Sequence, residues 1–178
     1  NHPSLVMWGA GNESDKPFGP AIDMMGRLSL ELDGSRPFHR GEAWGGSDHN
    51  YNCWWDDAHL NHNLNMTSPF WGEFGIASLP HIESVRRYLA EEKDRWPSRP
   101  GDHFRHHTPI FGTMGEFGKL SQYSGYFMPD TTLAEFITGS QRAQVVGVRH
   151  TLERARTLWP ETTGALYYKM NDNYPGVS

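Results

Sequence analysis

The sequence has almost no cysteine, no long apolar run and no surplus of positive charge. Cys53 is the one cysteine in 178 residues, so an internal disulfide is excluded and the fold does not depend on an oxidising compartment. No stretch approaches the roughly 20 apolar residues of a membrane-spanning helix. The net charge of −5 argues against nucleic-acid binding, which is marked by clustered basic residues. We therefore expect a soluble, single-domain protein without nucleic-acid or membrane partners, in the cytoplasm or in a secreted or periplasmic space.

Aromatic residues and turn formers are abundant instead. The chain is 13% aromatic with 7 tryptophans, and it contains 19 glycines and 12 prolines. This composition is typical of enzymes whose long loops carry large binding surfaces. The chain opens on the apolar run 5–8, with no leader to cover that expected strand. We therefore expect it to come from a longer protein.

Short apolar segments alternate with segments of helical periodicity. This alternation predicts an α/β fold with parallel strands. A capping box, Thr132 with Glu135, marks the start of a long helix. Residues 15–20 and 41–47 are predicted as loops, and 96–130 as an irregular insertion. The expected strands are 5–8, 36–39, 48–55, 69–77 and 164–170, and the expected helices are 21–32, 82–95 and about 133–155.

Two glutamates occupy positions where parallel α/β folds carry chemistry. Glu13 follows the first expected strand, and Glu73 lies within a later one, among Trp, Phe and Gly. The carboxyl ends of such strands gather functional residues. A desolvated carboxyl has a raised pKa and can donate a proton, while a hydrogen-bonded carboxylate stays ionised and can attack. Two such groups face each other in glycoside hydrolysis, although each glutamate could also be an ordinary strand-end carboxylate.

Four motifs resemble glycoside hydrolase family 2, which contains β-galactosidases, β-glucuronidases and β-mannosidases. The segment NHPSLVMWGAGNE (1–13) resembles the family's acid/base segment, and FWGEFGIASLP (70–80) its nucleophile strand, nearest the β-mannosidase branch. DGSRPFH (33–39) resembles the segment between them, and GALYYKMNDNYP (164–175) the last strand of the barrel. The motifs follow the family's order and span the chain nearly end to end.

The resemblance implies a (β/α)8 TIM barrel, of which residues 1–178 would form the C-terminal part, about strands 4 to 8. It implies that Glu13 is the general acid/base, Glu73 the nucleophile, and Asn12 a partner of the sugar's 2-hydroxyl. The reaction would be a retaining double displacement on a β-linked oligosaccharide or glycoside, with carboxyls about 5–5.5 Å apart. It needs no cofactor and no metal.

Further side chains are candidate substrate contacts. Aromatic rings can stack on sugar faces, although ordinary core packing is the alternative for each of them. The aromatic candidates are Trp8, Tyr51, Trp54, Trp55, Trp71 and Tyr168. The candidates for sugar-hydroxyl contacts, at the ends of expected strands, are His39, Asp48, His49, Asn171 and Asp172.

Several alternatives stay open. The motif Gly-Glu-Phe-Gly recurs at 115–118, but Glu116 falls in the irregular insertion, so we expect a loop residue there. His103, His106 and His107 could be metal ligands in a metal-dependent hydrolase, but a solvated loop fits their spacing better. The family's β-mannosidases usually carry Trp and Gln where this chain has Tyr168 and Lys169, so the sugar stays open.

Half a barrel leaves two sheet edges open. We therefore expect the missing barrel half, or a second copy of the chain, to cover them, and the isolated chain to be unstable and inactive otherwise. A non-catalytic carbohydrate-binding remnant is the alternative function.

Overall fold

The computed structural model describes residues 2–55, 59–91, 106–107, 116–129, 131–171 and 174–177. Within them it is an α/β structure with five strands, in which every paired strand is parallel to its neighbour. The strands are β1 (Trp8–Gly9), β2 (Phe38–His39), β3 (Ser47–Asn50), β4 (Phe70–Phe74) and β5 (Gly164–Tyr167). The predicted α/β class with parallel strands is therefore confirmed.

The helices are α1 (Asp15–Leu32), α2 (Asn52–Trp55), the 3-10 turn η1 (His62–Asn65), α3 (Ile82–Tyr88), α5 (Glu116–Gly125) and α6 (Leu133–Thr157). The predicted capping box is confirmed at the start of α6, where Thr132 and Glu135 satisfy each other's backbone amides. None of the described helices is both long and apolar enough to cross a membrane.

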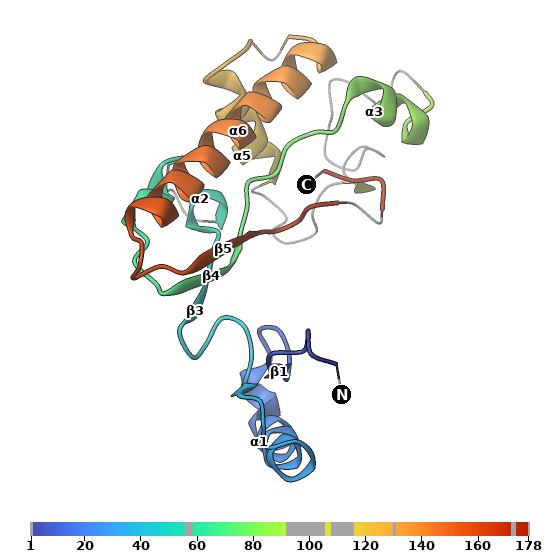
Figure 1. Cartoon of the computed structure of the whole chain (residues 1–178). Helices are drawn as coiled ribbons and strands as arrows, with labels where there is room; N and C mark the ends of the chain where they lie inside the picture. Colours follow the sequence, from blue (N-terminus) through green and yellow to red (C-terminus); the bar gives the residue numbers. More distant parts are fainter. Residues whose placement is uncertain are drawn as a thin grey trace.

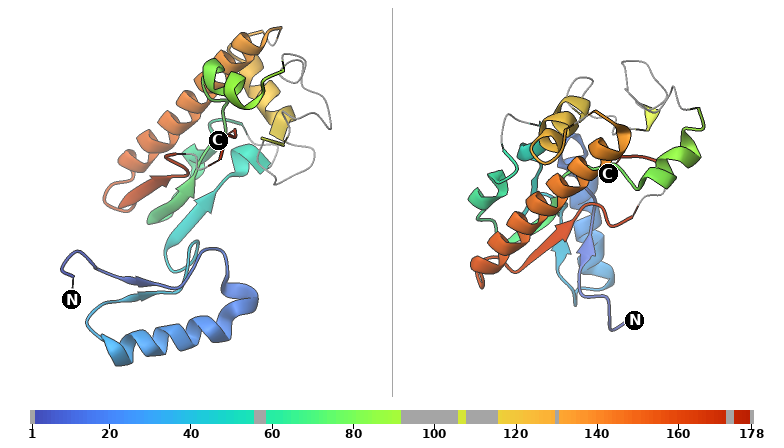
Figure 2. Two further views of the ribbon diagram at one scale, coloured as in Figure 1. Left: turned by 90° about the vertical axis from the view of Figure 1, so that its right-hand side faces the viewer. Right: turned by 90° about the horizontal axis from the view of Figure 1, so that it is seen from above.

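The strands form two open sheets and not a closed barrel in the described part of the chain (Figure 1). β1 pairs with β2 beside α1, and the second sheet has the order β3-β4-β5. Residues 40–46 join β2 to β3 without a helix. Beyond β1 and β2 the backbone pairing continues, because Glu13 donates its N–H to the carbonyl of Glu42 and Glu42 donates to that of Gly11. This continuation carries the ends of the first sheet toward the second (Figure 2).

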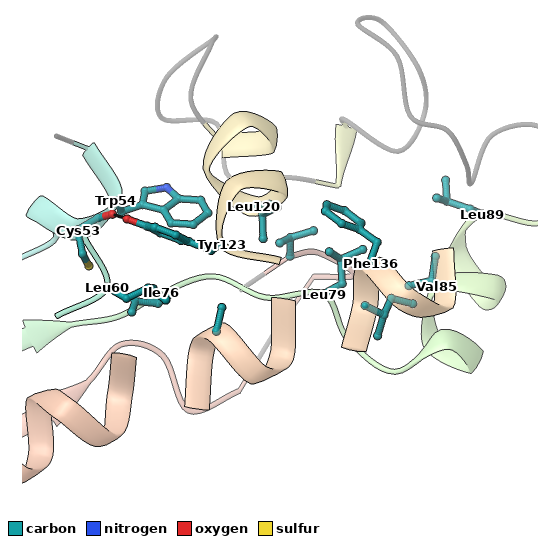
Figure 3. Close-up of a cluster of buried hydrophobic side chains, with 13 residues drawn as sticks. Cys53, Trp54, Leu60, Ile76, Leu79, Val85, Leu89, Leu120, Tyr123 and Phe136 are labelled. Atoms are coloured by element: carbon teal, nitrogen blue, oxygen red, sulfur yellow. Dashed lines mark hydrogen bonds between the residues drawn. The ribbon is translucent and has the colours of Figure 1, made fainter. Parts of the chain in front are cut away.

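The main hydrophobic core lies between helices α2, α3, α5 and α6 and the segment after β4 that carries Ile76 and Leu79 (Figure 3). Leu120 and Tyr123 of α5 and Phe136 of α6 are completely buried there. Gly139 and Gly147 let α6 approach its neighbours closely. A methyl group at Gly139 would collide with the backbone of Ser124 in α5, and one at Gly147 with the side chain of Ile76.

Several sequence-based boundaries are wrong. The strand expected at 5–8 forms only at Trp8–Gly9, and those expected at 69–77 and 164–170 end at Phe74 and Tyr167. The strand expected at 48–55 ends at Asn50, and α2 begins two residues later because Cys53 and Trp54 face the core. Helix α1 begins at Asp15 and includes Pro20, although 15–20 was expected to be a loop. The insertion expected to be irregular contains α5, so Glu116 starts a helix instead of lying in a loop.

Candidate active site

The two glutamates singled out in the sequence meet in the folded chain. Glu13 follows β1 and Glu73 lies in β4, on different sheets. One carboxylate oxygen of each, together with a ring nitrogen of His49 from β3, all lie within 4.8 Å of one another. Two acidic groups this close can act on opposite sides of one bond.

Glu13 has an unusual backbone. Its φ is 49°, in the left-handed region that non-glycine residues rarely adopt. The hydrogen bond from its N–H to the carbonyl of Glu42, 2.6 Å long, holds this conformation. The side chain is 60% exposed. Glu13 is the more open of the two carboxyls because it sits on this turn. A carboxyl that donates a proton is expected to be enclosed by apolar side chains, and Glu13 is not.

Glu73 is enclosed and held by a tyrosine. Its side chain is 19% exposed, and the Tyr51 hydroxyl donates a 2.7 Å hydrogen bond to Oε2. Burial, and after it the Glu73 carboxylate, raises the pKa of the Tyr51 phenol far above its ordinary value. The phenol therefore stays protonated and keeps donating its hydrogen bond to Glu73. The two carboxyls thus differ in their surroundings, because Glu73 is enclosed and receives a hydrogen bond whereas Glu13 is exposed.

A histidine lies between the two carboxylates. The Nδ1 atom of His49 is 2.7 Å from Glu13 Oε1 and 3.7 Å from Glu73 Oε2. Its Nε2 atom is 3.8 Å from Oε2 of Glu42. Glu42 was missed in the sequence because the glycine-rich stretch around it has no periodicity. The available signal was position, since Glu42 follows the second expected strand as Glu13 follows the first.

Glycines in the nucleophile motif make room for this arrangement. A methyl group on Gly72 would collide with the Glu42 carboxylate and with the Ser47 hydroxyl, which itself donates to Glu42. A methyl group on Gly75 would collide with the carbonyl oxygen of Tyr168. The two glycines of Gly-Glu-Phe-Gly therefore let Glu42 and Ser47 on one side, and Tyr168 on the other, pack closely beside Glu73.

Three further predicted residues lie beside the carboxylates. Asn12 is exposed and forms an isolated parallel bridge with Glu42. His39 places Nε2 3.3 Å from Glu42 Oε1. Tyr168 follows β5, is 55% exposed, and donates its N–H to the carbonyl of Phe74.

Other predicted residues are placed elsewhere. Trp71 is 0% exposed and Trp54 is 6% exposed, so both belong to the core, the alternative that the sequence left open. The indole of Trp8 donates to Asp33 at the end of α1, and Asp48 accepts from Ser68. Asn171 is exposed beyond β5. Asp172 and the side chain of Trp55 lie outside the described residues.

The predicted histidine cluster does not join the carboxylates. His103 lies outside the described residues. His107 stacks on Tyr174, and the hydroxyl of Tyr174 donates to the carbonyl of His106. These two histidines therefore pack against residues 174–177. In the described chain, Glu13, His49 and Glu73 form the only group in which three His, Cys, Asp or Glu side chains bring potential ligand atoms within 4.8 Å.

A separate groove lies away from this cluster. It has a volume of about 980 Å³ and runs between α6 and β5, lined among others by Val145, Leu152, Trp159 and Ala165. Val145 and Trp159 are 65% and 69% exposed. An apolar groove beside an unpaired edge strand indicates a face that packs against further protein, in contrast to the polar carboxylate cluster.

Parallel strands with two carboxylates near the carboxyl ends of β1 and β4 are the arrangement expected in part of an α/β barrel. Residues 1–98 match the family described as "Glycosyl hydrolases family 2, TIM barrel domain". The chain belongs to this family, whose substrates are glycosides.

A solved structure supports the same conclusion. The β-D-mannosidase of Dictyoglomus thermophilum matches all of this chain with a TM-score of 0.83 and 25% sequence identity. The chain covers 24% of the length of that protein. No curated protein matches the sequence.

Proposed function

We propose that the chain is part of a retaining β-glycosidase in which Glu13 is the general acid/base and Glu73 the nucleophile. The observation that carries this proposal is the close approach of the two carboxylates. Retaining enzymes hold their carboxyls about 5–5.5 Å apart and inverting enzymes about 6.5–9.5 Å, which leaves room for a water. A nearest approach within 4.8 Å favours retention.

The reaction would proceed in two displacements. Glu13 donates its proton to the glycosidic oxygen while a Glu73 oxygen attacks the anomeric carbon, so the leaving group departs as an alcohol. The covalent glycosyl-enzyme then reacts with water. Glu13, now a carboxylate, removes a proton from that water, its oxygen bonds to the anomeric carbon, and Glu73 is released as a carboxylate.

The substrate would be a β-linked glycoside or oligosaccharide, and similarity to a β-D-mannosidase makes β-mannosides the first to test. Asn12 would contact the 2-hydroxyl, and Tyr51 would support Glu73. His39 and Tyr168 lie beside the carboxylates and are the next candidates for sugar contacts. Asp48, Trp55, Asn171 and Asp172 stay candidates from the sequence alone. No cofactor is needed for this chemistry.

The chain would be the C-terminal part of the barrel. The unpaired edges of β1 and β5 and the apolar groove beside β5 are the faces that the preceding barrel half would cover. Experiments on activity therefore need the full-length protein that carries this sequence.

Covalent labelling tests the proposal. Full-length protein treated with an activated 2-deoxy-2-fluoro β-mannoside should gain the mass of one glycosyl group on a peptide containing Glu73. Glu73→Gln should abolish the labelling. Glu116→Gln is the matched control because it changes the same Gly-Glu-Phe-Gly motif at 115–118, and it should leave labelling unchanged. Loss of labelling in the Glu116 variant, with retention in the Glu73 variant, would overturn the assignment.

The second candidate is a carbohydrate-binding remnant without activity, which the open sheets favour. It predicts sugar binding by calorimetry with no label on Glu73 from any 2-fluoro glycoside. A metal-dependent hydrolase makes a different prediction, because its activity would be lost in the presence of a chelator. Full activity with the chelator would agree with the two-carboxylate mechanism.

A further inference from the structure

We propose that His49 and Glu42 are positioning residues that hold the acid/base Glu13, and that His49 does not bind a sugar hydroxyl. This proposal rests on the proposed function. It changes the role expected from the sequence, where His49 was a candidate sugar contact at the end of a strand.

The contacts of His49 point to Glu13. A ring nitrogen carries at most one hydrogen, and 2.7 Å is a hydrogen-bond distance whereas 3.7 Å is not. We assign the ring hydrogen to Nδ1, where Oε1 of Glu13 lies within hydrogen-bond distance and Oε2 of Glu73 does not. With Oε1 engaged, Oε2 is the oxygen of Glu13 that remains to exchange a proton with the substrate.

The position of His49 suits a fixed support better than a sugar contact. Its side chain is 6% exposed, in the middle of the carboxylate cluster, although Glu13 itself is 60% exposed. Its Nε2 atom is buried and has no hydrogen-bond partner. The nearest charged group behind it is the Glu42 carboxylate, 3.8 Å away. The ring is therefore enclosed by protein on both nitrogens.

Glu42 lies behind the ring, 3.8 Å from Nε2 and beyond hydrogen-bond distance, on a segment that is itself bonded to Glu13. The Glu42 carbonyl accepts the Glu13 N–H, and its carboxylate accepts from the Ser47 hydroxyl. The groups that face His49 are thus three carboxyls, Glu13, Glu42 and Glu73. Tyr51 adjoins Glu73, and His39 adjoins Glu42. A ring surrounded in this way can donate to Glu13 with little freedom to turn elsewhere.

The hydrogen bond matters most when Glu13 has given up its proton. A donor N–H stabilises a carboxylate more than a neutral acid, because charge-assisted hydrogen bonds are stronger. It also fixes the direction of Oε2 toward the departing oxygen. Substrates with poor leaving groups depend on that proton, and substrates with acidic leaving groups do not. Loss of the hydrogen bond from His49 should therefore lower the rate only for substrates with poor leaving groups.

The test compares two variants over a series of leaving groups in the full-length protein. His49→Leu should lower kcat/KM about 10- to 100-fold for mannosides with poor leaving groups, a part of the roughly 10²–10⁴-fold that acid catalysis supplies. For 2,4-dinitrophenyl mannoside the change should stay within about 3-fold, because little proton donation is needed. His49→Asn should restore most of the loss, since its amide N–H occupies the place of Nδ1. His59→Gln, at an exposed histidine, is the control.

Each outcome decides the matter. A steeper dependence on the leaving group in His49→Leu, corrected in His49→Asn, supports the proposal, and a smaller loss of the same kind in Glu42→Gln supports the part played by Glu42. An equal fall for all leaving groups, or no rescue by asparagine, would overturn it. In either of these cases the label on Glu73 would still show that the proposed function stands; absence of the label in the unchanged protein would remove both.

Discussion

At the scale of single residues, the neighbours of the two carboxyls decide which chemistry each can perform. Glu73 is enclosed and receives a hydrogen bond from Tyr51, whereas Glu13 is open and rests on a strained backbone held by Glu42. Strain of this kind persists only where the surrounding structure enforces it, and it is concentrated at functional sites. Under the proposed function, this asymmetry would let Glu73 attack while Glu13 exchanges protons with a ligand.

Tyr51→Phe should weaken the nucleophile without altering proton donation. The phenol stays protonated because burial and Glu73 raise its pKa, so the variant removes a donor to a carboxylate at every working pH. Such bonds contribute about 1.5–3 kcal/mol, and we expect kcat/KM to fall about 10- to 100-fold. The loss should be similar for good and poor leaving groups, the opposite of His49→Leu. Tyr126→Phe, at an exposed tyrosine, is the control; a loss limited to poor leaving groups would contradict this role.

Gly72→Ala should disturb the site although it changes neither carboxylate of the proposed pair. The added methyl group would collide with the Glu42 carboxylate and Ser47, and the support behind His49 would have to move. We expect a loss of activity that is largest for poor leaving groups, as in Glu42→Gln. Activity equal to that of the unchanged protein would show that Glu42 can move without consequence.

At the scale of secondary-structure elements, glycine sets the distance between α5 and α6. Gly139 faces Ser124, whose backbone carbonyl lies 2.7 Å from where a methyl carbon would be. Backbone cannot turn away as a side chain can, so larger residues would force the helices apart. Gly118 of α5 has nothing within 4 Å of that position.

This contrast gives a matched pair of substitutions. Gly139→Ala should lower the free energy of unfolding by about 1–3 kcal/mol, the usual cost of overpacking. Gly118→Ala should leave it unchanged or raise it by up to about 1 kcal/mol, because alanine is the better helix former. Urea denaturation followed by circular dichroism measures both. Equal effects at the two positions would contradict the close approach of α5 and α6.

The N-terminus of α6 should make stability depend on pH. Hydrogen bonds from the side chains of Thr131 and then Thr132 lower the pKa of Glu135 below its ordinary 4.5. The ionised group thus contributes stability that is present above the unfolded pKa and is lost as the pH falls through the folded pKa. Thr132→Ala should cost about 1 kcal/mol near neutral pH. The difference from the unchanged protein should shrink in acid; a difference that stays constant down to pH 2 would contradict the capping geometry.

The sequence predicted those elements whose cause is local. The capping box at Thr132 and the apolar runs at 69–77 and 164–170 act over a few residues, and the structure has a helix start and two strands there. The run 5–8 is a strand only from Trp8. Helices α2 and α5 were not predicted because contacts between residues far apart in the sequence stabilise them. The Tyr123 hydroxyl of α5 donates a hydrogen bond to the Cys53 carbonyl of α2. The carboxylate pair was predicted from motifs, but Glu42 and the position of His49 depend on how two sheets meet, which no local pattern encodes.

At the scale of the whole molecule, the described structure leaves apolar surface uncovered in two places. One is the groove between α6 and β5, with exposed Val145 and Trp159, and the other is α1, where Leu28 and Leu32 are 44% and 84% exposed. Apolar patches of this kind mark protein contacts. Both adjoin sheets whose outer strands are unpaired, β5 and β1.

The isolated chain should therefore associate or fail to fold stably. In size-exclusion chromatography with light scattering, we expect the 178-residue chain to exceed the mass of 20.3 kDa or to unfold without a cooperative transition. The full-length protein should show neither behaviour. Trp159→Arg should reduce association of the isolated chain by placing charge in the groove. A stable, cooperatively folded monomer would contradict the incomplete barrel.

A cut in the helix-free link at 40–46 would place the two carboxyls of the proposed pair on different polypeptide pieces. The piece before the cut would carry Glu13, and the piece after it Glu73. Neither piece could turn over substrate by itself, so hydrolysis of a fluorogenic glycoside would register their reunion. Fused to two other proteins, the pieces would serve as a split reporter of whether those proteins meet.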